Sequence, residues 1–431
     1  MSSYLMLNEL SFAEAAAAIE RGDITSERLV RDCLDRIEAR DGDVQAWAFI
    51  DPELALAQAR ACDQASERKG LLHGVPFGVK DIIATHDMPT GMGSPIYDGH
   101  RAGYDASCVA LLRAAGAVIL GKTVTVEFAG MAAPPTANPH NLDCTPGGSS
   151  SGSGAAVADF MVPAAFGTQT AGSIHRPAAH CGVIGYKPTF DTFGLHGVWP
   201  AAQSLETLGM LTRSMDDVEL LSAALLGRPA QLERSPVAAP RIAICKTHLW
   251  DIVKPETVEA IEIARETLST KGAEISELVL PDSFDELVPA RDIISSYERA
   301  RATAHEWFNH RDLLSAPLQR GVAKGFAWKY EEYRHAMKVG AERRRDLDVL
   351  FNDYDAIIAP CTAGEAPPDR NSTGDHTHIG MWNLLHVPSY ALPTHKGPNG
   401  MPVAIQVMGR HGEDAALFDV AKWVLEQLVP A

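Results

Sequence analysis

Between residues 71 and 130, short apolar runs alternate with helical spacing, and this alternation limits the available folds more than any other feature. The runs Val75–Val79 and Ala117–Leu120 are typical of buried strands, while Cys108–Ala115 has the spacing of a helix. Strands and helices that alternate in this way bury their apolar faces against one another, as a sheet covered by helices. The pattern therefore predicts an α/β fold.

Capping residues and periodicity place further elements along the chain. Ser11 and Glu14 fit a capping box, and Gly22 ends the predicted helix. Other predicted elements are strands at 241–245, 355–360 and 403–407 and helices at 254–271 and 414–428. The Pro-rich stretch 228–240 fits either a linker between domains or a long surface loop, and we favour the loop.

Charge balance and cysteine pattern exclude several classes of protein. Lys and Arg number 38 against 55 Asp and Glu, and the net charge of −17 repels a phosphate backbone, so we expect no direct nucleic-acid binding. Seven cysteines without a C-x-x-C pair favour a reducing compartment over a disulfide framework. Without a recognisable signal peptide or an apolar stretch of about 18 residues, we expect a cytoplasmic protein that does not span a membrane.

The run Gly147–Gly154 contains only glycine and serine. Such composition is typical of a flexible linker. However, apolar helix and strand signals follow at once, and a second small-residue turn stands at Gly167–Ser173, so both turns are candidates for close backbone approach to a ligand. Gly148–Gly152 also matches the nucleophile elbow G-x-S-x-G, but the four prolines in Pro134–Pro146 leave no strand before it.

Lys80 lies inside an apolar run, between Val79 and Ile82. A lysine at the exposed end of a strand, with its stem along apolar surface, is the commoner arrangement. Burial would instead depress its pKa and leave part of the side chain neutral near pH 7. A neutral lysine could then act as a base.

Three segments resemble the amidase signature family. They are the Lys80 segment with Gly74–Pro76 before it, the stretch 145–189 that contains both small-residue turns, and the C-terminal stretch 355–409. The resemblance covers nearly the whole chain, and it is weak only between about 230 and 350.

This resemblance implies one large α/β/α domain, residues 1–431, around a twisted mixed sheet covered by helices. The core signature region would be 71–220, and a variable substrate-pocket region would span about 291–385. The favoured interpretation of 228–240 as a loop agrees with a single domain.

The resemblance also implies a Ser-Ser-Lys triad. Lys80 matches the base, Ser149 matches the bridging serine that the family holds with a cis peptide bond, and Ser173 matches the nucleophile. The oxyanion hole would be the backbone N–H groups of Thr170, Ala171, Gly172 and Ser173. A serine hydroxyl needs an adjacent base to attack an amide, and this chemistry requires no metal and no organic cofactor.

Arg176, Met131 and Trp382 are the predicted substrate contacts. Arg176 resembles the arginine that binds a substrate carboxylate in malonamidase-like members, and its alternative role is to donate hydrogen bonds to loop carbonyls. Core positions are the alternative for Met131 and Trp382. Gln169 replaces the Asp of some branches, and the role of His175, where a branched apolar residue or arginine is usual, stays open.

We expect an amidase that converts a small-molecule amide into a carboxylic acid and ammonia or an amine, with a homodimer as a candidate assembly. Two alternatives remain: the glutaminase (A-type) subunit of a tRNA-dependent amidotransferase, and a hydrolase of urea derivatives of the allophanate or biuret type. His376 and His378 alternate like metal ligands on a strand. Because no third ligand is evident, we favour a surface loop over a zinc site.

Overall fold

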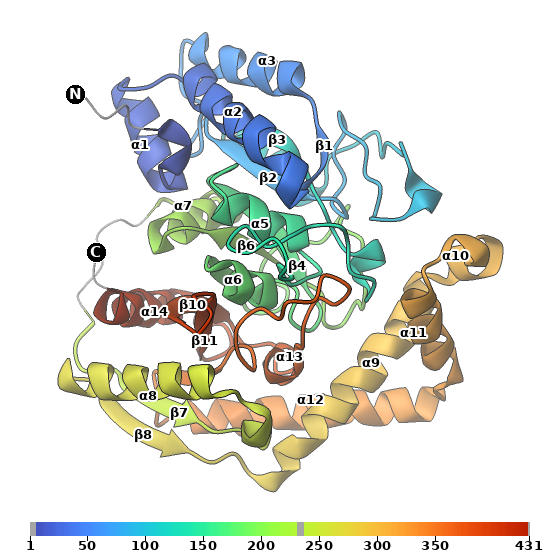
Figure 1. Cartoon of the computed structure of the whole chain (residues 1–431). Helices are drawn as coiled ribbons and strands as arrows, with labels where there is room; N and C mark the ends of the chain where they lie inside the picture. Colours follow the sequence, from blue (N-terminus) through green and yellow to red (C-terminus); the bar gives the residue numbers. More distant parts are fainter. Residues whose placement is uncertain (1–5, 231–236, 430–431) are drawn as a thin grey trace.

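One mixed sheet of eleven strands runs through the residues that the computed structural model describes, 6–230 and 237–429 (Figure 1). The strands lie in the order β1-β3-β2-β4-β6-β5-β10-β11-β9-β7-β8. Their bounds are β1 Trp47–Ile50, β2 Pro76–Lys80, β3 Val118–Thr123, β4 Ala164–Gln169, β5 Ile184–Lys187, β6 Thr207–Thr212, β7 Arg241–Cys245, β8 Glu274–Leu278, β9 Ala356–Pro360, β10 Ser389–Lys396 and β11 Pro402–Met408. The predicted α/β fold around one mixed sheet is therefore confirmed.

Fourteen α-helices accompany the sheet in the described part of the chain. Their bounds are α1 Phe12–Arg21, α2 Ser26–Val44, α3 Pro52–Asp63, α4 Ser107–Ala114, α5 Ser151–Ala158, α6 His175–Cys181, α7 Met215–Leu226, α8 Pro255–Thr270, α9 Leu287–Ala302, α10 Ala304–Asn309, α11 Ala316–Ala327, α12 Tyr330–Leu350, α13 Thr377–Leu384 and α14 Asp414–Leu428. Helices α5 and α6 pack on the central strands, whereas α9, α10 and α11 (yellow to orange) extend to one side (Figure 1). None of the described helices is both long and apolar enough to cross a membrane.

Helix α1 begins and ends where its capping residues predicted. The Ser11 side chain accepts from the Glu14 N–H, the Glu14 carboxylate accepts from the Ser11 N–H, and α1 ends at Gly22 with φ 76°. A residue without Cβ takes this left-handed conformation without strain, which is why the helix stops there. The capping box is therefore confirmed.

Strands β2 and β4 position the candidate site because they are parallel neighbours in the interior of the sheet. Every residue of both strands is buried. Phe77 of β2 and Phe166 of β4 pack edge to face, with ring centroids 4.7 Å apart. Parallel strands end at the same edge of a sheet, so Lys80 and Gln169, their last residues, are brought to one place.

The Gly-Ser run is ordered, and the flexible-linker interpretation is wrong. Ser151 begins α5 and bonds the Gly147 carbonyl oxygen at 2.7 Å, while Ser153 bonds the Phe166 carbonyl oxygen at 2.8 Å. A Cβ on Gly152 would lie 2.1 Å from the Ala46 carbonyl oxygen. Gly152 therefore lets two protein segments meet, and it does not serve approach to a ligand.

The Pro-rich stretch 228–240 connects two parts of the same sheet. Strand β6 precedes it and β7 follows it, and both belong to the eleven-stranded sheet. A linker between independently folded domains would separate two sheets, whereas the strands before and after this stretch belong to one sheet. Residues 231–236, within this stretch, lie outside the described residues.

Candidate active site

Lys80 is fully buried at the carboxyl end of β2, which rules out the exposed strand-end arrangement. Its Nζ donates to Ser149 Oγ at 2.8 Å and to Thr168 Oγ1 at 3.0 Å. Burial lowers the pKa of Lys80 from 10.5 to about 7. Glu206 opposes that shift, and the positive charges of two arginines add to it. A large fraction of Lys80 is therefore neutral near pH 7.

Ser149 occupies the turn before α5, where the Gly148–Ser149 peptide bond is cis. The following residue, Ser150, joins this turn to the loop after β4. Its N–H donates to the Ser173 carbonyl oxygen at 3.3 Å, and its Oγ accepts from the Thr168 N–H at 3.4 Å. The two small-residue turns are thus held side by side.

The loop 170–173 connects β4 to α6 and carries Ser173. Within residues 6–230 and 237–429, the four backbone N–H groups of this loop donate to no protein acceptor. Thr170 fixes the start of the loop, because its Oγ1 donates to Glu206 at 2.8 Å and its carbonyl oxygen accepts from Asn383 at 2.7 Å. Unbonded N–H groups on a fixed loop can stabilise a developing oxyanion.

Gln169 orders the turn after Ser173. Its Oε1 accepts from the N–H groups of Ile174 and His175 at 2.9 and 3.0 Å. Its Nε2 lies 3.0 Å from His175 Nδ1, and His175 Nε2 lies 3.2 Å from the Ser389 carbonyl oxygen. The ring must accept at one nitrogen and donate at the other, which requires its neutral form. Burial lowers the pKa of His175 to about 3, so His175 acts as a neutral bridge.

Arg176 braces the turn that carries Ser149. Its Nε and Nη2 donate to the Gly148 carbonyl oxygen at 3.0 and 2.6 Å, and its Nη1 donates to the Gly374 carbonyl oxygen at 2.5 Å. Burial lowers the pKa of Arg176 to about 10. Arg176 also lines the cavity described below, but these contacts are those of the loop-bracing alternative.

A cavity of about 320 Å³ opens over Ser173 and the preceding loop residues. Its volume lies at the lower end of the range for small-molecule sites, roughly 300–1,000 Å³. Loop 129–131, helix α9 and helix α11 form its walls. Of the three residues predicted to form a triad, Ser173 lines the cavity, whereas Lys80 and Ser149 are buried and do not line it.

Of the other two predicted substrate contacts, one lines this cavity and one does not. Met131 is 62% exposed and lines the cavity wall. Trp382 does not line it, and this prediction needs correction. Only 1% of Trp382 is exposed, because it packs in a hydrophobic cluster with Ala290 and Ile294 of α9. Its core alternative holds, and it supports the helix that forms a cavity wall.

Sequence reasoning missed three polar residues around Lys80. Thr168 accepts from Lys80, Ser150 joins the two turns, and Glu206 is a buried carboxylate whose charge raises the Lys80 pKa. A polar residue in a buried strand must find a partner, and this was the available signal for Thr168. Glu206 lies outside every motif, so nothing in the sequence singled it out.

Among the described residues, the two candidate histidines for a metal belong to no group of three potential metal ligands. His376 is at the N-terminus of α13, where its ring nitrogens lie 3.4 Å from Arg176 Nη1 and 3.0 Å from Arg291 Nη1. Two guanidinium groups at this distance repel a metal cation. His378 is buried, with 2% of its surface exposed, so the predicted surface loop is wrong for this residue.

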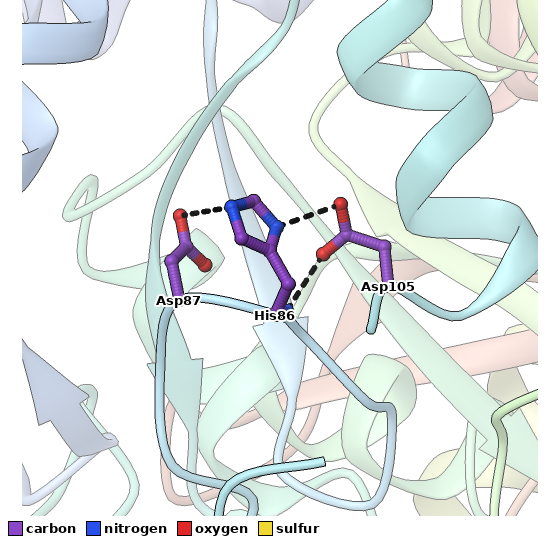
Figure 2. A group of neighbouring side chains, drawn as sticks. All are labelled: His86, Asp87 and Asp105. Carbon is purple, nitrogen blue, oxygen red and sulfur yellow. Dashed lines mark hydrogen bonds and ion pairs between the residues drawn. The ribbon is translucent and has the colours of Figure 1, made fainter. Parts of the chain in front are cut away.

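Figure 2 shows a group of three potential ligands elsewhere, with His86 between Asp87 and Asp105. His86 Nδ1 lies 3.0 Å from Asp105, and Arg113 pairs with Asp87 at 2.7 Å and with Asp105 at 3.2 Å. The Arg113 guanidinium pairs with both carboxylates and occupies part of their ligand capacity, so we interpret the group as an ion-pair network.

Comparisons with known proteins agree on one family. The family model named Amidase matches residues 28–418. The A-subunit of glutamyl-tRNA(Gln) amidotransferase from Anaeromyxobacter sp. (strain K) is 33% identical to this chain. The alignment covers 98% of this chain and 97% of that protein. A crystal structure of an amidase has a TM-score of 0.90 at 30% identity and covers 97% of this chain and 100% of that one. The peptide amidase from Stenotrophomonas maltophilia has a TM-score of 0.84 at 27% identity over 97% of each chain.

Proposed function

The chain belongs to the amidase family and is an amide-cleaving enzyme, and we propose that it hydrolyses a small-molecule amide through Ser173, Ser149 and Lys80. The observation that carries the proposal is the buried contact of 2.8 Å between Lys80 Nζ and Ser149 Oγ. A lysine with a pKa of about 7 in that contact can accept a proton at neutral pH. Ser173 lies at the floor of the adjoining cavity, where a substrate can reach it.

In the proposed reaction, Ser149 Oγ transfers its proton to neutral Lys80 Nζ and accepts the proton of Ser173 Oγ. Ser173 Oγ forms a bond to the amide carbon, and the N–H groups of loop 170–173 stabilise the oxyanion. Each well-placed donor contributes about 3 kcal/mol. The proton returns through Ser149 to the leaving nitrogen as the C–N bond breaks. Water then attacks the acyl-enzyme, and Ser173 leaves with its proton restored.

Covalent labelling tests the nucleophile. We expect a phosphonate to add one phosphonyl group, and peptide mass spectrometry to place it on Ser173. Ser173→Ala should abolish labelling, while Ser151→Ala, a serine bonded to its own turn, should not. An adduct on Ser149 or Ser150 would contradict the assignment.

A glutaminase subunit is the second candidate, because the similarity to the A-subunit of an amidotransferase extends over 98% of this chain. The purified chain should release ammonia from simple aliphatic or aromatic amides if it acts alone. Ammonia from glutamine only, and only with partner proteins added, would favour the second candidate. Allophanate and biuret in the same panel test the third candidate, a hydrolase of urea derivatives.

A further inference from the structure

The cavity over Ser173 is cationic although the chain is strongly anionic. Its lining includes four basic side chains, Arg176, Arg291, Arg299 and Lys324, and one carboxylate, Asp292. The whole chain has a net charge of −17. A local excess of positive charge in a low-dielectric cleft attracts an anion and raises its local concentration.

One face of α9 supplies two of the four basic side chains, Arg291 and Arg299, together with the carboxylate of Asp292. The cavity-lining residues recur along the helix as one stripe: Val288, Arg291, Asp292, Ser295, Ser296 and Arg299. The opposite stripe, which includes Ala290 and Ile294, packs in the core with Trp382. Helical periodicity alone would place such a polar stripe in solvent, but here it faces an internal cavity.

The three arginines differ in how many of their N–H groups are already bonded. Arg176 donates three times to loop carbonyls. Arg291 contacts the His376 ring at 3.0 Å and pairs with Asp292 at 3.0 Å. Arg299 donates only to the Phe128 carbonyl oxygen, at 3.1 Å, and no carboxylate lies within ion-pair distance of it in the described residues. A guanidinium has five N–H donors, so most of the N–H groups of Arg299 remain available to donate to a ligand.

Carboxylates compensate part of this charge, because Asp375 acts on Arg176 and Arg291, and Glu206 acts on Arg299. Burial lowers the pKa of Arg299, Glu206 opposes the shift, and Arg291 adds to it through like-charge repulsion. His376, between Arg176 and Arg291, has a pKa well below its usual value because of burial and of these arginines, so it is a neutral spacer. An anion in the cavity would relieve the repulsion.

We propose that the substrate amide carries a carboxylate, and that Arg299, assisted by Arg291, binds this group while the amide carbon lies at Ser173. The position of the amide carbon at Ser173 rests on the proposed amide hydrolysis, whereas the binding of a carboxylate by Arg299 does not. A guanidinium and a carboxylate form two parallel hydrogen bonds, which fix orientation as well as supply affinity. Arg176 already donates to the Gly148 carbonyl oxygen, so it is not the residue that binds the carboxylate.

Matched substrate pairs test the proposal by kinetics. Succinamate and glutaramate carry the carboxylate, and succinamide and glutaramide are their neutral counterparts. Arg299→Gln keeps a donor for Phe128 and should raise KM for the acidic amides about tenfold to a hundredfold, as expected for a lost hydrogen bond to a charged group. The kcat for those amides, and KM for the neutral amides, should change less than about threefold, because the lost contact is made equally in ground and transition states.

Two further variants separate a specific site from general electrostatics. Arg291→Gln should raise KM for the acidic amides by a smaller factor than Arg299→Gln, because Asp292 and His376 already share its donors. Lys324→Gln removes one exposed charge at the cavity rim and should change KM by less than about threefold. Equal losses on acidic and neutral amides, or a loss in Lys324→Gln as large as in Arg299→Gln, would overturn the proposal.

A binding measurement keeps the test independent of catalysis. Succinate and glutarate should bind to Ser173→Ala in calorimetry, and the added Arg299→Gln should weaken that binding at least about tenfold. This result with no turnover of any amide would retain the anion site and reject the proposed hydrolysis. Absence of dicarboxylate binding, or an affinity that Arg299→Gln leaves unchanged, would reject the anion site even if the amides are hydrolysed.

Discussion

Replacing Lys80 with methionine should stabilise the protein at neutral pH while removing its activity. The pKa of Lys80 falls from 10.5 to about 7 on folding, so the unfolded chain binds the extra proton between these two values. Stability therefore rises with pH in this window as the penalty of burying the lysine fades. At about 1.4 kcal/mol per pKa unit, this penalty is roughly 5 kcal/mol below pH 6, about 4 kcal/mol at pH 7 and about 2 kcal/mol at pH 9.

Lys80→Met removes that penalty and also loses the bonds to Ser149 and Thr168, each contributing about 1 kcal/mol. The variant should thus be more stable than the parent by about 2 kcal/mol at pH 7, and the difference should vanish near pH 9. Urea denaturation at pH 7, 8 and 9, followed by tryptophan fluorescence, measures it.

Lys187→Met is the matched control. Lys187 is also fully buried, burial lowers its pKa to about 7, and its Nζ donates to the Pro188 carbonyl oxygen at 2.7 Å. This variant should show the same pH dependence of the stability difference but keep its activity. If the parent and Lys80→Met gave parallel stability curves between pH 7 and 9, Lys80 would not be charged in the unfolded and neutral in the folded chain, and the reasoning would fail.

Three further outcomes follow from the site. The acid limb of kcat/KM should rise about tenfold per pH unit below 7 as Lys80 loses its proton, and a flat profile from pH 5.5 to 8 would contradict its role as base. Arg176→Lys loses the paired bonds to the Gly148 carbonyl oxygen and should lower kcat equally for acidic and neutral amides; a loss confined to acidic amides would show that it reads the substrate instead. Gln169→Glu cannot donate to His175 and should lower the free energy of unfolding by about 2 kcal/mol, measured by urea denaturation; an unchanged value would show that this bond is not needed.

Much of the fold could be predicted from the sequence, because the signals were local. The predicted strand 241–245 and helix 414–428 match β7 and α14 residue for residue. Small residues indicated part of the site for the same reason. The turns stand at 147–150 and 170–173, whereas the rest of the two small-residue stretches belongs to α5 and β4. The neighbourhood of Lys80 and Ser149 was expected from family resemblance, and the structure adds the distance of 2.8 Å and the burial.

The remainder depended on tertiary structure. Arginines at a spacing of eight along α9 predict a solvated helix face, and only the packing of α9 over the loop after β4 turns Arg291 and Arg299 toward a cavity. Trp382 was predicted to line the pocket because aromatic residues serve cores and pockets equally well, and the sequence does not say which neighbours surround it. Glu206 influences Lys80 through space, from a loop more than 100 residues further along the chain.

The candidate reacting groups and the candidate recognition groups occupy separate stretches of the polypeptide. Residues 80–176 include the proposed triad and the proposed oxyanion loop. Residues 288–299 supply the charged cavity wall, on a helix that packs against the apolar cluster around Trp382. Amino-acid substitutions in one stretch can therefore leave the other stretch unchanged. A protein that acquired a different α9 could accept another class of amide while its acyl-transfer residues stayed unchanged. In design, α9 and the residues that pack beneath it could be transplanted together as one unit.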